Sequence, residues 1–260
     1  MKALPLTEIS ILAPFVAYLE EMGAPANRLL GNQNISREML DRGQGKITKR
    51  QLYSYFSSAG IPDLGYQVGA RHGMRFIGPV GQSVLRSATL LDAINTFDDH
   101  LSRWMDGKQF WIEPAGENVW LYNQANDGME NLHEQANQCS LITLISLIRE
   151  VAGPEWIPSK IRLHQPRGLA LSSFPLLAEF LSRRLPRLRS TPRVSRGPQA
   201  GPQQIVPALE KTLRDQLAFI GFPTIEQTAE IAGFSPRTLQ RKLSEDGLTY
   251  QRLSDRIRFQ

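Results

Sequence analysis

The sequence has almost no cysteine and no long apolar run. Cys139 is the only cysteine in 260 residues, so no intrachain disulfide can form and no cysteine-rich zinc site is available. Its longest apolar runs, such as residues 141–148, are far shorter than the roughly 20 residues that a membrane-spanning helix needs. The N-terminus also lacks the unbroken apolar stretch of a signal peptide. We therefore expect a cytoplasmic protein with no transmembrane segment.

Charge is distributed unevenly along the chain. Residues 1–180 contain 16 Lys/Arg and 18 Asp/Glu, a balance of −2, whereas residues 181–260 contain 14 and 7, a balance of +7. A basic end beside a near-neutral body is typical of a chain with one part that meets a polyanion. A solvated arginine-rich linker would give the same asymmetry, and charge alone does not separate the two. The apolar content of 41% excludes disorder and fibrous structure for most of the chain.

Hydrophobic periodicity predicts a mainly helical N-terminal region. Helices are predicted where apolar residues recur at steps of three and four or where helix stop signals bound a segment. The predicted helical segments are residues 6–31, 48–60, 63–72, 79–88, 89–105 and 129–151. Residues 109–124 differ, because aromatic and β-branched residues flank a Pro114-Ala115-Gly116-Glu117 turn, which predicts a β-hairpin. Residues 160–164 fit a short strand. The fold class expected is mainly α with a small β component (α+β).

Proline and arginine concentrate between residues 186 and 207. Five prolines lie there among arginines and glycines, with few large apolar side chains. Such a segment cannot pack a core and favours a stiff, extended connector. We therefore expect a domain over residues 1–185, a linker over 186–207 and a second domain over 208–260.

The segment after residue 223 has the pattern of two short helices. Thr224 and Gln227 form a predicted capping box, and Gly233 is a predicted helix end. Ser235 is a good N-cap, and Pro236 stands at the first helical position, which proline tolerates. The predicted shared core is Ile225, Ala229, Ala232, Gly233, Phe234, Leu239 and Leu243.

The second predicted helix, residues 236–245, combines a buried face with a basic, amide-bearing one. Arg can bond guanine and Gln can bond adenine at the major-groove edge, and Lys242 suits a phosphate. Two short helices, a tight glycine turn and this second helix predict a helix-turn-helix that contacts DNA. The spacing of the residues alone fits an ordinary helical hairpin with a solvated face equally well.

The string Ala-x-x-x-Gly-Phe-Ser-Pro-Arg-Thr-Leu-Gln-Arg, from Ala229 to Arg241, resembles the first helix-turn-helix of the AraC/XylS transcription regulators. The resemblance extends over residues 224–250. It implies that Arg237, Gln240 and Arg241 read bases, and that Ser235, Thr249 and Tyr250 lie near phosphates. Residues 7 to about 165 are similar to the arabinose-binding-like N-terminal domain of such regulators, which senses a small molecule or mediates pairing.

Two parts of the chain depart from the family pattern. Members carry two helix-turn-helix units joined by a long helix, and residues 254–260 look like the start of that helix, so the second unit is expected to be absent. Because the missing unit would supply phosphate and base contacts, we expect binding by a monomer to be weak. Residues 165–205 lack the strand pattern expected at the end of the sensing domain.

No motif of the sequence predicts catalysis, a metal site or a cofactor. His133 and Glu134 begin a near match to the zinc motif His-Glu-x-x-His, but Asn137 occupies the fifth position, so a solvated helix face is the better interpretation. Five aromatic residues lie in and just before the predicted hairpin: Trp104, Phe110, Trp111, Trp120 and Tyr122. We expect them to belong to the core, and the lining of an effector pocket is the less well supported alternative.

Three functions follow from the sequence, in descending order of support. The first is a DNA-binding transcription regulator, with double-stranded DNA, a small-molecule effector and a second copy of the chain as its candidate partners. The second is a truncated partner that pairs with full-length relatives through residues 1–165 and does not read DNA. The third, an enzyme of the N-terminal domain, has little support from the residues.

Overall fold

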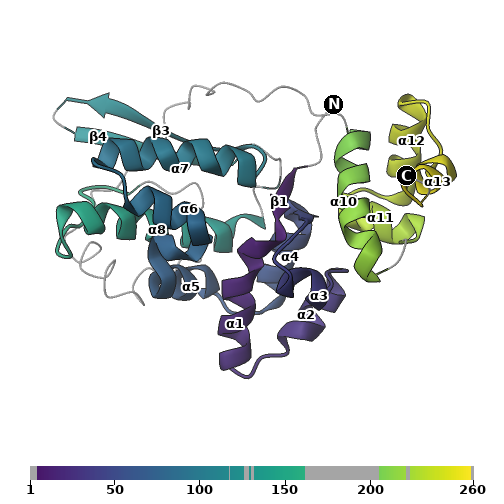
Figure 1. Ribbon diagram of the computed structural model, residues 1–260, viewed down its shortest axis with the longest axis horizontal. Helices are drawn as coiled ribbons and strands as arrows, with labels where there is room; N and C mark the ends of the chain where they lie inside the picture. The colour runs from purple at the N-terminus through teal and green to yellow at the C-terminus, as the bar shows by residue number, and fades with distance from the viewer. Residues whose placement is uncertain are drawn as a thin grey trace. The chain divides into compact units, whose positions relative to one another are not determined.

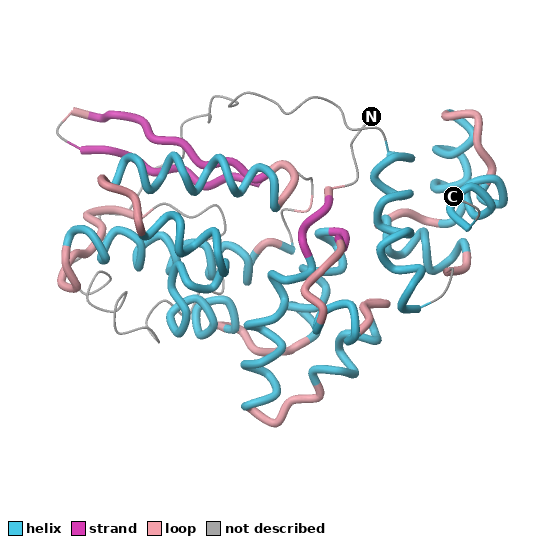
Figure 2. Tube along the Cα trace, viewed as in Figure 1, coloured by secondary structure: helices cyan, strands magenta, loops and turns pink. Residues whose placement is uncertain are grey.

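A computed structural model describes residues 5–116, 118–125, 129, 132–161, 205–220 and 223–258. The described chain is mainly helical with a small β component, as the sequence predicts (Figure 2). The β component consists of two small antiparallel sheets, of which the sequence predicted only the hairpin. It divides into two compact units that interleave along the sequence, and each is described by itself. The first unit contains Met1–Gly60, Phe97–His133 and Pro202–Gln260, and the second contains Ile61–Thr96 and Glu134–Gly201.

The N-terminal part of the first unit is a short strand pair with helices around it. Its elements are β1 (Leu6–Glu8), the 3-10 helix η1 (Ile9–Leu12), α1 (Ala13–Glu21), α2 (Ala26–Asn32), α3 (Arg37–Asp41), β2 (Lys46–Thr48) and α4 (Lys49–Ser58). β1 pairs antiparallel with β2, with Leu6 opposite Thr48. The expectation of helix from residue 6 is therefore wrong for β1, because pairing with a distant strand satisfies the backbone there. The helix predicted after Thr48 is confirmed as α4, and Thr48 and Gln51 form its capping box.

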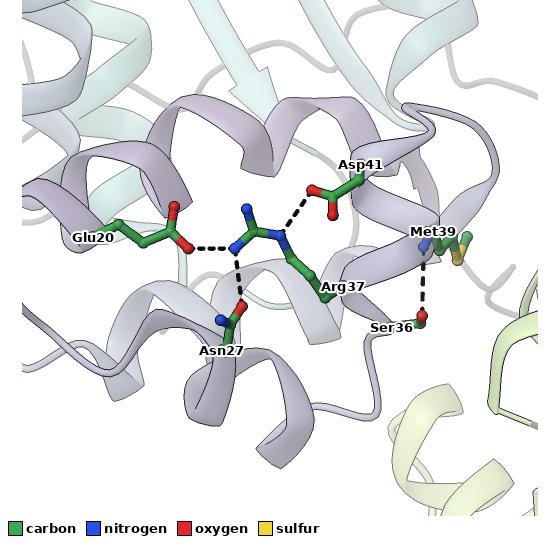
Figure 3. Close-up of polar contacts among 6 residues, drawn as sticks. All are labelled: Glu20, Asn27, Ser36, Arg37, Met39 and Asp41. Carbon is green, nitrogen blue, oxygen red and sulfur yellow. Dashed lines mark hydrogen bonds and ion pairs between the residues drawn. The ribbon is translucent and has the colours of Figure 1, made fainter.

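Arg37 at the start of α3 connects three helices (Figure 3). Its guanidinium donates to Glu20 of α1, to Asn27 of α2 at 2.9 Å and to Asp41 of α3 at 2.8 Å. Hydrogen bonds to Glu20 and Asp41 raise the pKa of Arg37. One cation thus fixes the relative positions of α1, α2 and α3.

The predicted hairpin is confirmed as β3 (Lys108–Ala115) and β4 (Asn118–Ala125). The two strands are antiparallel, with Lys108 opposite Ala125 at one end and Ala115 opposite Asn118 at the other. The last part of α7 (Leu90–Trp104) packs on it, because Phe97 lies 4.9 Å from Phe110 between ring centroids and Asp98 accepts a hydrogen bond from the Phe110 amide (Figure 1). Trp111 and Tyr122 stack face to face across the two strands. An isolated bridge between Thr7 and Met105 joins this region to β1.

The second unit is built on the close crossing of α5 and α8. Its elements are α5 (Leu64–His72), the 3-10 helix η2 (Gly73–Ile77), α6 (Gly78–Leu85), the first part of α7, and α8 (Glu134–Ala152). Gly65 and Gly69 of α5 face α8 so closely that a Cβ on either would collide with the backbone of Gln135 or the side chain of Ile142. The amide of Gly65 donates to the Gln135 side chain at 2.7 Å.

The start of α8 corrects two expectations. The helix begins at Glu134 and not at residue 129. His133 and Gln135 are buried, so the solvated helix face expected for residues 133–137 is wrong at both positions. Gln135 is buried because its amide also donates to the carbonyls of Ile61 and Pro62. Cys139 is buried in α8.

The C-terminal part of the first unit consists of α10 (Ile205–Ile220), α11 (Ile225–Ala232), α12 (Pro236–Glu245) and α13 (Tyr250–Arg258), drawn in green to yellow in Figure 1. α10 was not expected from the sequence, and residues 205–207 of the expected linker form its first turn. The rest of that linker and most of the short strand expected over residues 160–164 lie outside the described residues. No helix in the described ranges has the length and apolar character to cross a bilayer.

The α5–α8 crossing makes a prediction about stability. Gly65→Ala is expected to lower the free energy of unfolding by about 1–3 kcal/mol, because the added methyl group forces the helices apart. Urea unfolding of the full chain measures this change. The matched control is Gly31→Ala in α2, where a Cβ meets nothing within 4 Å, and the free energy there should rise by about 0.5–1 kcal/mol. Equal effects of the two variants would contradict the close crossing.

Candidate nucleic-acid interface

α11 begins and ends at the residues that the sequence predicts. The Thr224 hydroxyl accepts from the Gln227 amide at 3.3 Å, and the Gln227 side chain accepts from the Thr224 amide at 2.9 Å. Gly233 ends the helix in the left-handed region with a φ of 72°. The amide of Phe234 then bonds to the Ala229 carbonyl at 2.8 Å, so the chain turns sharply. A residue with a side chain would be strained at position 233.

α12 starts within three residues of that turn. The Ser235 hydroxyl accepts from the Thr238 amide at 3.2 Å, which confirms Ser235 as the N-cap, and Pro236 follows at the first turn. Leu239 and Leu243 are fully buried. The local sequence therefore fixes where both helices start and how they are joined.

One apolar cluster holds the helices together. Its buried members from α11 and α12 are Ala229, Ala232, Leu239 and Leu243, and Ile225 and Phe234 pack against it, which places all predicted core side chains together. α10 and α13 supply most of the remaining wall, with Leu209, Leu213, Leu253 and Ile257, and Leu6 of β1 is buried in the same cluster. The small alanines permit close approach of the helices.

The predicted base-reading residues share the solvent-exposed face of α12. Arg237, Gln240 and Arg241 are all exposed, and they lie at i, i+3 and i+4, which places them on one side of the helix. Arg241 forms an ion pair with Glu245 at 2.5 Å, one turn along the helix. The face thus presents two guanidinium groups and one amide, and one guanidinium has an internal partner.

The residues expected near phosphates occupy three different settings. Ser235 and Thr249 are exposed hydroxyls at the N-termini of α12 and α13, where Thr249 accepts from the Arg252 amide at 3.2 Å. The Lys242 ammonium lies 5.2 Å from the centroid of the Phe234 ring. The Tyr250 hydroxyl is different, because it donates to the Pro223 carbonyl at 2.5 Å and contacts the Thr228 hydroxyl at 2.7 Å. Its hydroxyl therefore ties α13 to the start of α11.

The partners of Tyr250 at this tie were not expected from the sequence. Thr228 is fully buried, and no local pattern indicates that its hydroxyl meets Tyr250. Among the described residues, no group of three or more His, Cys, Asp or Glu side chains is placed to hold a metal ion.

The family comparison matches the N-terminal part of the chain. The model of the arabinose-binding domain of AraC transcription regulator, N-terminal, matches residues 23–176, which is more than half of the sequence. The chain belongs to this family. The domain is the sensing domain of a regulator, a class that is typically not enzymatic. The match ends before α10, so α11 and α12 lie outside it. No curated protein matches the chain.

The Tyr250 tie makes a prediction. Tyr250→Phe is expected to lower the free energy of unfolding by about 1–3 kcal/mol, because the Pro223 carbonyl and the Thr228 hydroxyl both lose their partner. Thermal and urea unfolding measure the change, and Thr228→Val in a double-mutant cycle tests whether the two side chains couple. If the two substitutions change the free energy of unfolding by strictly additive amounts, the two side chains do not couple, which would argue against the tie.

Proposed function

We propose that the chain is a sequence-specific DNA-binding transcription regulator controlled by a small molecule or by subunit pairing. The observation that carries the proposal is the exposed face of α12. Its three polar side chains project from a helix whose other face is fixed in a shared core, next to a tight turn from α11. These features support a helix-turn-helix, in which the second helix enters the major groove.

The chemistry of that face suits base edges. Arg237 and Arg241 can each bond the O6 and N7 atoms of guanine, and Gln240 can bond N6 and N7 of adenine. Arg241 would exchange its ion pair with Glu245 for such a contact. Since an exposed ion pair contributes little, this exchange costs little.

Phosphate binding is assigned to residues around the face. Ser235 and Thr249 stand at helix N-termini, where backbone amides and the helix dipole favour anions. Lys242 adds a cation, and the Tyr250 hydroxyl holds the start of α13 in position. Residues 205–260 contain 8 Lys/Arg and 7 Asp/Glu, so most of the basic excess belongs to residues 181–204, which contain 6 and 0. Non-specific affinity for DNA is expected to depend on that segment as well.

The N-terminal domain supplies the control. Membership in the arabinose-binding domain family supports a small-molecule effector, and its place in AraC regulators supports coupling to DNA binding. A homodimer would present two reading helices and would compensate for the weak affinity of one. A cytoplasmic location fits both a DNA partner and a sequence with a single cysteine.

Selection from random duplex DNA at two salt concentrations tests this function. The full chain is expected to enrich particular sequences, and binding should fall steeply with salt. Arg241→Ala should cost roughly 5-fold to 150-fold in affinity for an enriched site, the value of about 1–3 kcal/mol for one bidentate base contact. The control for charge is Arg86→Ala, at the exposed C-cap of α6 in the other unit, and this variant should retain the selected sequence.

Two outcomes would contradict the proposal. If no sequence is enriched, or if Arg241→Ala and Arg86→Ala bind every sequence alike, α12 does not read bases. Pairing with a full-length relative without selective binding would then favour the truncated-partner function.

A further inference from the structure

The outward side of α12 carries an acid as well as the three predicted base-reading residues. Glu245 lies eight positions after Arg237 and four after Arg241, so these three residues form one row along the helix. Arg241 is two residues from each of the buried Leu239 and Leu243, and it therefore lies about 160° from both around the helix axis. Glu245 thus belongs to the row whose middle member faces most directly away from the core.

The side chains of Glu245 and Arg241 converge although their backbones are one helical turn apart. Nη1 of Arg241 donates to Oε1 of Glu245 at 2.5 Å, and the two side chains are 65% and 39% exposed, Arg241 first. Among the described residues, Glu245 has no other hydrogen-bond donor to its side chain. The pair therefore presents a cationic donor and an anionic acceptor side by side, on the surface that the proposed function directs toward DNA.

A G·C base pair presents the matching groups in the major groove. Guanine offers the acceptors N7 and O6, and cytosine offers its N4 amino group as a donor. O6 and N4 are hydrogen-bonded to each other within the base pair, so they lie about 2.9 Å apart. This separation is close to the 2.5 Å between the side chains of Arg241 and Glu245. Two neighbouring charges of the protein can thus meet two neighbouring groups of one base pair.

Glu245 needs a new donor when Arg241 moves onto guanine, because that move takes away the donor that its carboxylate has in the described chain. An anion without a partner is repelled in the groove, since DNA carries one negative charge per about 1.7 Å of its axis. Cytosine N4 and adenine N6 are the donors of the major-groove edge, and cytosine N4 lies on the same base pair as the guanine. An A·T pair in the same orientation places thymine O4 there, an acceptor that repels the carboxylate.

From these observations we propose that Glu245 is a specificity-determining residue of the DNA contact: it accepts a hydrogen bond from the N4 amino group of the cytosine that pairs with the guanine bound by Arg241. The two side chains then read one G·C base pair together. The proposal rests on the proposed function, because it adds a contact to the same reading helix. Glu245 adds no affinity for DNA in general, since its charge opposes every phosphate. It acts by penalising base pairs that place an acceptor at that point.

The first test locates the base pair and measures its discrimination. Sites are selected from random duplex DNA with the full chain and with Arg241→Ala, and the position whose guanine preference is lost is the one that Arg241 reads. There the wild type should favour G·C over A·T by at least about fivefold more than Glu245→Ala does. The matched control is Glu38→Ala, which removes an equivalent exposed pair with Arg42 in α3, also at 2.5 Å and one turn apart. It should keep the wild-type preference.

The second test removes the cytosine amino group. A selected site is synthesised with pyrimidin-2-one, a base without that amino group, opposite the guanine that Arg241 reads. The wild type should lose at least about fivefold more affinity from this change than Glu245→Ala loses, because only the wild type has a carboxylate that loses its donor. The weakened base pair is common to both measurements and cancels in the comparison. The same analogue at a cytosine elsewhere in the site is the DNA control and should cost both proteins equally.

The outcomes separate the two proposals. Equal losses from the analogue in the wild type and in Glu245→Ala overturn the contact to cytosine and leave DNA reading by α12 intact. A uniform gain in affinity for all sequences in Glu245→Ala, with unchanged base preferences, also overturns it, because the carboxylate then acts only by repulsion. So does a preference at the Arg241 position for a base other than guanine. If the wild type enriches no sequence at all, the proposed function fails and the cytosine contact fails with it.

Discussion

The C-terminal helices depend on one shared apolar cluster. α11 has 8 residues and α12 has 10, and isolated helices of that length are marginal in water. Burial of Leu239 and Leu243 against Ala229, with Leu213 of α10 and Leu253 of α13 around them, gives these helices the stability that propensity does not. Because that cluster takes up one face of α12, the opposite face must be polar, and its side chains are held at defined positions. The candidate interface is therefore a consequence of the packing behind it.

The same capping chemistry occurs at the start of α4 and at the start of α11. Thr48 with Gln51 and Thr224 with Gln227 form equivalent capping boxes, and each sets the start of a helix. They differ in burial: Thr224 is exposed, whereas Thr48 is buried and its hydroxyl donates to the Ile231 carbonyl of α11 at 2.8 Å. A cap can thus act locally at one site and hold two distant segments together at the other. The sequence does not distinguish these two cases, because both capping boxes have the same Thr-x-x-Gln motif.

Local signals explain which elements could be predicted. The hairpin β3–β4, the helix α4 and the pair α11–α12 each combine a clear period with a specific turn or cap, and all were predicted close to their observed bounds. β1 was predicted as helix because Leu6 lies one helical step before Ile9, and only pairing with β2, about 40 positions along the chain, makes residues 6–8 a strand. α10 was missed because its first turn continues the proline-rich segment and its face is buried by distant helices. For the site, the exposed residues of α12 follow from helical spacing, but the partners of Tyr250 and Thr48 depend on contacts that no local pattern contains.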